Sequence, residues 1–244
     1  MTSSSKTTIA AGSDSKHGAG GDRVCWSCAT PLNGAELFCG SCGRVQLLSS
    51  DIDYFQVFTL PRKLRLDVAS LEREFYRLSR RLHPDVYSRA SQQEQEWSLE
   101  NSSLVNDAYR TLKDPIRRTE YLLKLEGAPS TDEGGPRKED RIPADLLEEV
   151  FELNMQLDEM RMNKQTGDVD PQLQQDLLAA KANFDGQLRE TNSSLERLWE
   201  KWDTELDGGD DQRRTAVREE LAALLDRRRY IRNLVNSVDE AIET

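Results

Sequence analysis

Four cysteines are the residues whose spacing most directly indicates chemistry. They are the only cysteines among 244 residues and form two pairs, Cys25 with Cys28 and Cys39 with Cys42, with ten residues between the pairs. Tetrahedral zinc takes four soft ligands at about 2.3 Å, and a CxxC turn sets two sulfurs on one side of the metal. With no cysteine elsewhere to pair with, the pattern predicts a metal site in a reducing compartment, not a disulfide scaffold.

The expected metal is a structural zinc ion. Four thiolate ligands leave no open coordination position for catalysis, and residues 23–49 are too few to build a core of their own. Iron in a rubredoxin-like site, with the same ligands, is the less favoured alternative. We expect Gly40 and Gly43 to supply the positive φ that such knuckles require. A docking role for this module stays open.

A His-Pro-Asp tripeptide at positions 83 to 85 directly follows a segment with helical periodicity. The apolar residues of this segment recur at steps of three and four: Val68, Leu71, Phe75, Leu78 and Leu82. Because Pro84 disfavours helix for the residue before it, we expect an exposed turn that presents the Asp85 carboxylate to solvent. Basic residues lie on this segment away from the apolar stripe: Arg73, Arg77, Arg80 and Arg81.

The tripeptide is a poor candidate for catalysis. His83 alone has the chemistry of a general base. The other histidine, His17, is distant in sequence, and the chain has no nucleophile constellation, Gly-rich phosphate loop or HExxH motif. A basic helix beside a projecting carboxylate therefore predicts a binding surface, and we expect no enzymatic activity.

The elements that must position these residues are helices with clear end signals. Asp67 is an expected N-cap, and Ser91 with Glu94 forms an expected capping box. Asp114 and Pro115 open a further helix that Gly127 ends. The sequence thus predicts a helical unit over residues 51–127.

Residues 142–244 contain three longer segments with heptad-like apolar spacing, which predicts an antiparallel three-helix bundle. A Pro-, Gly- and charge-rich linker over residues 128–141 precedes it, and residues 1–22 are an expected disordered tail. The predicted fold is therefore mainly α: a small zinc-knuckle or ribbon module, a helical hairpin and a three-helix bundle.

The first segment of this bundle has more apolar residues than one core stripe needs. Leu147, Phe151 and Met155 recur every four residues beside the stripe that contains Leu146 and Val150. Carboxylates flank the surplus strip: Glu148, Glu152 and Glu159. An apolar strip rimmed by charge is typical of a partner site. The alternative is packing on residues 51–127, with Phe151 the member that best fits a core.

Composition excludes several classes of function. The net charge of −11 and pI near 4.9 disfavour general nucleic-acid binding. No apolar run approaches the roughly 20 residues of a membrane span, and the N-terminus lacks signal-peptide features. A monomer in the cytoplasm is expected, with the mitochondrial matrix as the alternative.

Several short segments, in order, resemble a J domain. They are DYFQVF at 53–58, the basic helix, His-Pro-Asp, NDAY at 106–109 and LKDP at 112–115. The run IRRTEYLLKLEG at 116–127 and the acidic-apolar run 146–160 resemble the HscB branch, some members of which carry a tetracysteine module in front. The resemblance covers about residues 51–244. One departure is Tyr87, where HscB-like proteins usually have Phe.

The resemblance implies a co-chaperone of iron–sulfur cluster assembly and transfer. Its J domain would stimulate the ATPase of a DnaK/HscA-type 70-kDa heat-shock chaperone, and its bundle would bind the scaffold protein IscU. The implied chaperone-binding residues are Arg73, Arg77, Arg80, Arg81, His83, Pro84 and Asp85. The implied scaffold-binding residues are Leu147, Glu148, Phe151, Glu152, Met155 and Tyr230. Glu148 departs from the apolar residue more frequent in the family.

Two alternatives stay open. A general J-protein would use the same chain to hold many unfolded clients without preference for the scaffold. A redox protein with Cys-ligated iron would absorb visible light, whereas a zinc protein is colourless.

Overall fold

The computed structural model describes residues 23–32, 34–49, 51–127, 143–167, 170–208 and 211–243. The expected tail over residues 1–22 and the expected linker over residues 128–141 therefore lie outside the described residues. The expectation of a mainly α fold is confirmed. Within the described ranges, β pairing is limited to two isolated bridges, Val24 with Pro31 and Phe38 with Val45, both in the cysteine module of residues 23–49.

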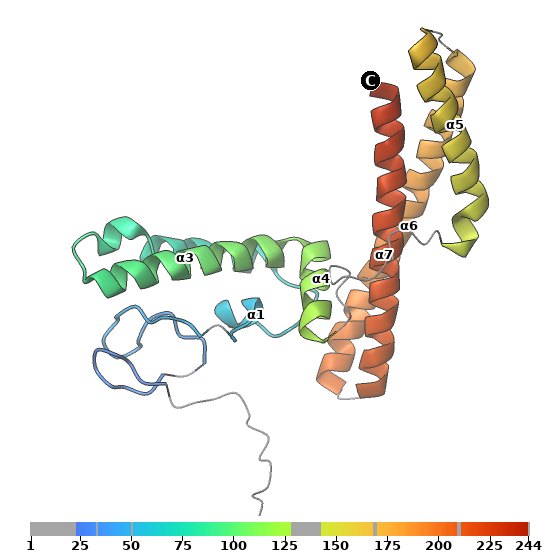
Figure 1. Cartoon of the computed structure of the whole chain (residues 1–244). Helices are drawn as coiled ribbons and strands as arrows, with labels where there is room; N and C mark the ends of the chain where they lie inside the picture. Colours follow the sequence, from blue (N-terminus) through green and yellow to red (C-terminus); the bar gives the residue numbers. More distant parts are fainter. Residues whose placement is uncertain are drawn as a thin grey trace, which may run out of the picture.

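Helices joined by short connections make up most of the rest of the described chain (Figure 1). In chain order they are α1 (Tyr54–Val57), α2 (Val68–Arg81), the 3-10 turn η1 (Pro84–Tyr87), α3 (Gln92–Lys113), α4 (Pro115–Leu125), the 3-10 turn η3 (Ala144–Leu146), α5 (Leu147–Thr166), α6 (Pro171–Gly208) and α7 (Asp211–Glu243). None of the helices in the described ranges combines the length and apolarity needed to cross a membrane.

The predicted helix ends are present. Asp67 accepts a hydrogen bond from the Ser70 N–H at the start of α2, and Ser91 with Glu94 forms a reciprocal capping box on α3. Asp114 caps α4, and Gly127 follows α4 with φ at +71°. These local signals act within one turn of chain, so the residues alone specify where the helices begin and end.

The molecule has two arms (Figure 1). One arm is the α2–α3 hairpin with the cysteine module beneath α3, and the other is the long α6–α7 hairpin, which runs across it. Helix α4 lies where the arms meet, and α5 packs along the distal part of α6 and α7.

The apolar core forms two clusters, whose boundary does not coincide with the predicted boundary between residues 51–127 and 142–244. One apolar cluster joins α1 to α4 and part of the cysteine module to the near halves of α6 and α7, through Leu195, Trp202 and Leu221 among others. A second cluster joins α5 to the distal halves of the same two helices, around Phe184 and Ile231. The three-helix bundle is therefore confined to the distal half, because the near half of the α6–α7 hairpin packs on the first arm.

Polar contacts fix the joint between the arms. The Asp203 carboxylate accepts the backbone N–H groups of Leu64 and Arg65, at 2.7 and 2.9 Å. The indole Nε1 of buried Trp202 donates to the Arg62 carbonyl at 3.2 Å. These bonds satisfy backbone groups of the α1–α2 connection from α6, so the two arms are held at one relative orientation.

Candidate functional sites

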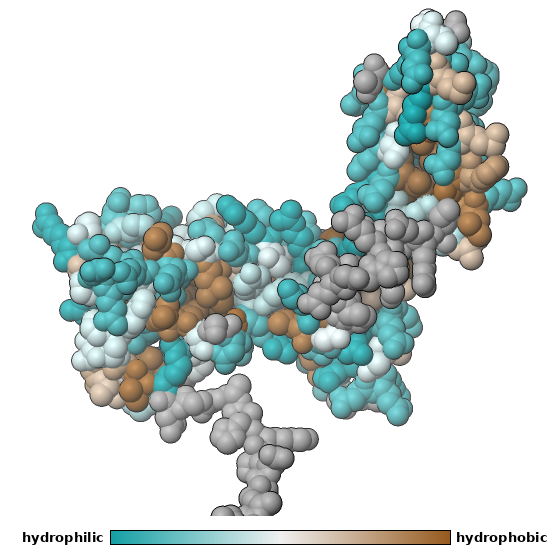
Figure 2. Space-filling model, in the orientation of Figure 1, coloured by the Kyte–Doolittle hydropathy of each residue, from teal (hydrophilic) through white to brown (hydrophobic). Residues whose placement is uncertain are grey.

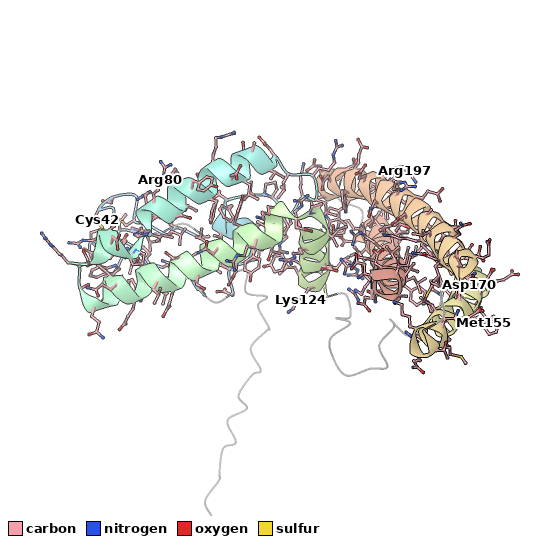
Figure 3. All side chains as sticks on the ribbon, turned by 90° about the horizontal axis from the view of Figure 1, so that it is seen from above. Cys42, Arg80, Lys124, Met155, Asp170 and Arg197 are labelled. Carbon is pink, nitrogen blue, oxygen red and sulfur yellow. The ribbon has the colours of Figure 1, made fainter. Side chains whose placement is uncertain are left out.

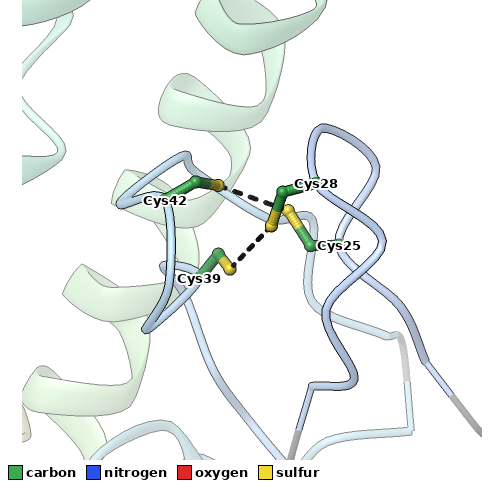
Figure 4. Close-up of side chains that lie close together, drawn as sticks. All are labelled: Cys25, Cys28, Cys39 and Cys42. Atoms are coloured by element: carbon green, nitrogen blue, oxygen red, sulfur yellow. Dashed lines mark hydrogen bonds between the residues drawn. The ribbon is translucent and has the colours of Figure 1, made fainter.

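The four cysteine sulfurs lie together, as the spacing predicts (Figure 4). Cys25 Sγ is 3.6 Å from Cys42 Sγ, Cys28 Sγ is 3.6 Å from Cys39 Sγ, and all four lie within 4.8 Å of one another. Ligands at about 2.3 Å from a tetrahedral metal are about 3.8 Å apart. The sulfurs are therefore spaced as the four corners of a tetrahedron around one metal ion would be.

The backbone forms each half of this site in the same way. The N–H of the residue after each second cysteine donates to the carbonyl of the first: Ala29 to Cys25 and Gly43 to Cys39, both at 2.9 Å. In both turns the residue whose N–H donates has positive φ: +57° at Ala29 and +74° at Gly43. The expectation of positive φ is confirmed for Gly43 and wrong for Gly40, whose φ is not positive. In the first pair of cysteines, Ala29 takes the position that Gly43 has in the second.

The closeness of the four thiols affects their pKa values and favours a bound cation. A hydrogen bond with Thr30 lowers the pKa of the Cys28 thiol to about 6. For Cys42 the Arg44 N–H lowers the pKa, but desolvation and the three neighbouring thiols outweigh it and raise the pKa to about 11. Protein groups alone thus do not stabilise four thiolates, whereas a divalent metal does. The donor set suits zinc and iron alike.

The His-Pro-Asp segment forms a tight, exposed turn between α2 and α3. Residues after His83 form the 3-10 turn η1 and not an irregular loop, and the Asp85 N–H donates to His83 Nδ1 at 3.3 Å. The Asp85 side chain is 91% exposed. The carboxylate is thus presented to solvent, as predicted, while the turn behind it is ordered by its own hydrogen bonds.

The four arginines of α2 are exposed but differ in what they contact. Arg77 forms an ion pair with Glu74 of the same helix, and Arg73 donates to Ser70. The guanidinium of Arg81 stacks over the ring of Phe38, 3.7 Å from its centroid. Phe38 precedes Cys39, so the cysteine module contacts one member of the predicted chaperone-binding set. No sequence pattern links these two segments.

The apolar strip of Leu147, Phe151 and Met155 is exposed along α5 (Figure 2). The three side chains are 52%, 69% and 60% exposed. Phe151 is thus not a core residue, because Val150, Leu153 and Leu157 already fill the α5 side of the bundle. The strip does not pack on the first arm either. Glu148 and Glu152 are exposed on the same helix.

Tyr230 lies differently from the strip. It is half-buried on α7 and packs against the distal core. Two exposed apolar side chains that the sequence reading did not include are Met162 on α5 and Leu178 on α6. Met162 follows Met155 by seven residues, which places both on the same face of α5, and this spacing is the signal that would have identified it.

The turn and the strip lie far apart. In Figure 3, Cys42 and Arg80 are at the free end of the first arm, and Met155 is at the opposite end of the molecule. The cysteine centre and the end of the basic helix therefore share one region, and the strip is a separate surface.

Comparisons with known proteins agree with this arrangement. The DnaJ domain profile matches residues 53–121. Relatives described as the iron–sulfur cluster co-chaperone protein HscB are 39% identical over 136 residues in Mus musculus and 38% identical over 138 residues in Homo sapiens. These alignments cover 54% and 55% of this chain and 56% and 57% of the relatives, so they span little more than half of each.

A crystal structure of the human co-chaperone protein HscB extends the likeness to nearly the whole fold. It aligns with a TM-score of 0.62 and 27% identity, covering 89% of this chain and 97% of that chain. The chaperone HscB from Vibrio cholerae aligns with a TM-score of 0.52 and 26% identity over 79% of this chain.

The helical hairpin, its exposed His-Pro-Asp turn and the DnaJ match define a J-domain protein. Within that class, the chain is similar to HscB co-chaperones, in sequence over about half of its length and in fold over most of it.

Proposed function

We propose that this protein is a co-chaperone of iron–sulfur cluster assembly that brings the scaffold protein IscU to a DnaK/HscA-type 70-kDa chaperone and stimulates the ATPase of that chaperone. The observation that carries the proposal is the exposed His-Pro-Asp turn at the end of a basic helix, joined to a second arm with an exposed apolar strip. The relatives named as iron–sulfur cluster co-chaperones support the same function.

The J-domain surface acts by binding and not by chemistry. The solvent-facing carboxylate of Asp85 is suited to pair with a cationic side chain of the chaperone, and Arg73 and Arg80 to meet an acidic patch. Such contacts change the ATPase only if they favour one conformation of the chaperone over another. In this proposal the chain itself carries no active site.

The apolar strip is the client site in this proposal. Phe151 and its two neighbours on α5 provide an apolar centre, and Glu148 and Glu152 a charged rim. A few exposed apolar anchors typically contribute most of the binding energy at such a surface. Because the core stripe of α5 is separate and buried, substituting the strip should leave the bundle folded.

One experiment with two variants tests both halves. Chaperone ATPase is measured with the wild-type chain, with His83→Gln and with Leu147→Ala/Met155→Ala, and scaffold binding to each is measured by calorimetry. We expect His83→Gln to abolish stimulation and retain scaffold binding. The strip variant should retain stimulation and lose binding about tenfold or more. Leu99→Ala, which truncates an exposed leucine on α3, is the matched control and should change neither quantity.

Other results would contradict specific parts of the proposal. Full stimulation by His83→Gln would exclude the turn as the chaperone contact. Unchanged scaffold affinity in the strip variant would exclude the strip as the client site. Equal affinity for the scaffold and for unrelated unfolded chains would instead favour the general J-protein.

A further inference from the structure

The His-Pro-Asp turn is supported from α3. The carbonyl of Leu82, the last residue before His83, accepts hydrogen bonds from the hydroxyls of Ser98 and Ser102, at 2.7 and 3.0 Å. Leu82 and Ser98 are fully buried. The residue that precedes the exposed turn is therefore fixed by buried hydrogen bonds from α3. The position of the turn thus depends on the position of the first half of α3.

The cysteine module contacts that same half of α3. Arg44 Nη1 forms an ion pair with Glu94 Oε1 at 2.6 Å, and Asn101 Nδ2 donates to the Gln46 carbonyl at 2.8 Å. The rings of Trp26 and Trp97 meet edge to face with centroids 5.9 Å apart. On the other side of the turn, Phe38 lies under Arg81 at the end of α2. The module thus contacts both helices that flank the turn.

Glu94 is the most constrained of these contacts. It is only 4% exposed, and its carboxylate accepts from both the N–H and the hydroxyl of Ser91, the N-cap of α3. Burial raises the pKa of this carboxyl, but the hydrogen bonds from Arg44 and Ser91 outweigh burial and hold the pKa below its usual value. Without Arg44, the carboxylate would be buried with only its cap as partner.

The contacting side chains are placed by the metal site itself. Trp26 lies between Cys25 and Cys28, Phe38 directly precedes Cys39, and Arg44 follows Cys42 by two residues. The buried residues around the sulfurs, Cys25, Leu32 and Cys39, form only a small cluster. The backbone that presents Trp26, Phe38 and Arg44 is therefore positioned by the cysteine ligands, together with Leu37 and Val45, which pack into the large apolar cluster.

We propose that Arg44 and Phe38 are positioning residues for the His-Pro-Asp turn, so that the metal-bound cysteine module sets the conformation of the chaperone-contact surface. This inference rests on the proposed function for its consequence, the stimulation of a chaperone ATPase. Its physical content, the coupling of module and turn, stands on the contacts above.

The test compares variants that break the ion pair from either side. Arg44→Ala removes it from the module and Glu94→Gln weakens it from α3, whereas Arg44→Lys keeps the charge. Arg23→Ala is the matched control, since Arg23 donates to the Gly34 and Leu47 carbonyls within the module. Bound metal, amide hydrogen exchange over residues 83–95 and the ATPase response to increasing co-chaperone are measured for each full-length variant.

We expect Arg44→Ala and Glu94→Gln to keep their metal and to lose amide protection across the turn about fivefold, given the worth of a partly exposed charged hydrogen bond. The half-maximal co-chaperone concentration should rise by a similar factor while maximal stimulation is unchanged, and Arg44→Lys should restore most of both. Arg23→Ala should resemble the wild type.

Unchanged amide protection in the metal-loaded Arg44→Ala and Glu94→Gln variants would overturn the inference, whatever their ATPase response. If the wild type stimulates no 70-kDa chaperone, the proposed function fails instead. The exchange measurement then still decides whether module and turn are coupled.

Discussion

At the scale of single residues, the two CxxC turns of the cysteine centre both have positive φ at the residue after the second cysteine. This residue is Ala29 in the first turn and Gly43 in the second. Gly43 adopts positive φ without strain, since glycine enters the left-handed region freely. Ala29 adopts it at the cost of a close approach between its Cβ and the backbone. The first knuckle is therefore held in place by its surroundings, namely the metal ligands and the bridge from Val24 to Pro31.

This asymmetry predicts opposite effects of two small substitutions. Gly43→Ala should weaken metal binding by about 1 kcal/mol because it adds left-handed strain. Ala29→Gly should strengthen it by somewhat less, because glycine loses more entropy on folding. Competition with a chromophoric chelator measures both. A loss of affinity in Ala29→Gly would show that strain at this position is negligible.

At the scale of elements, the module and the helices are stabilised by different means. Each helix of the first arm has its own N-cap and an apolar face within the large cluster. The module contributes Leu37, Val45 and Leu48 to that cluster but has few regular backbone hydrogen bonds of its own. We therefore expect the fold of the module to depend on a bound metal ion far more than the folds of the helices do.

Removal of the metal should unfold the cysteine module and leave the helices folded. With a strong chelator, residues 23–49 should lose protection from hydrogen exchange, while the helical circular dichroism signal stays nearly intact because α2 to α7 are packed by apolar contacts. The exposed start of α3 should lose part of its protection as Arg44 and Trp26 leave it. A large fall in helical signal would mean that the module supports the whole first arm.

At the scale of the whole molecule, the J domain and the long hairpin share one core. Trp202 of α6 is 1% exposed, within the cluster that also contains Leu64 and Leu82 of the first arm. The distal cluster around Phe184 is separate, although the same two helices pass through both. The His-Pro-Asp turn and the apolar strip on α5 are therefore joined by continuous helices and a packed joint.

Two large-to-small substitutions distinguish the clusters. Trp202→Ala should destabilise the protein by about 3–5 kcal/mol and lower amide protection in α2 and α3, because it opens a cavity in the shared core. Phe184→Ala, a comparable truncation in the distal cluster, should lower protection in α5 and leave α2 and α3 unchanged. Unchanged protection of the J domain in Trp202→Ala would show that the two arms unfold independently.

The sequence by itself determined the features that depend on a few neighbouring residues. The caps at Asp67, Ser91 and Asp114, the cysteine tetrad and the exposed His-Pro-Asp turn follow from side chains acting within one or two turns of chain. The surplus strip on α5 was also visible, because helical periodicity fixes which residues share a face.

Only the tertiary structure decided which segments meet. The ion pair of Arg44 with Glu94, the stacking of Arg81 on Phe38 and the burial of Trp202 against the J domain join residues 43 to 140 positions apart. Local sequence patterns do not predict such pairs, because each partner, taken alone, has the pattern of an ordinary surface or core residue. The same reason placed Phe151 in solvent: whether a second apolar stripe is buried depends on the number of helices packed around it.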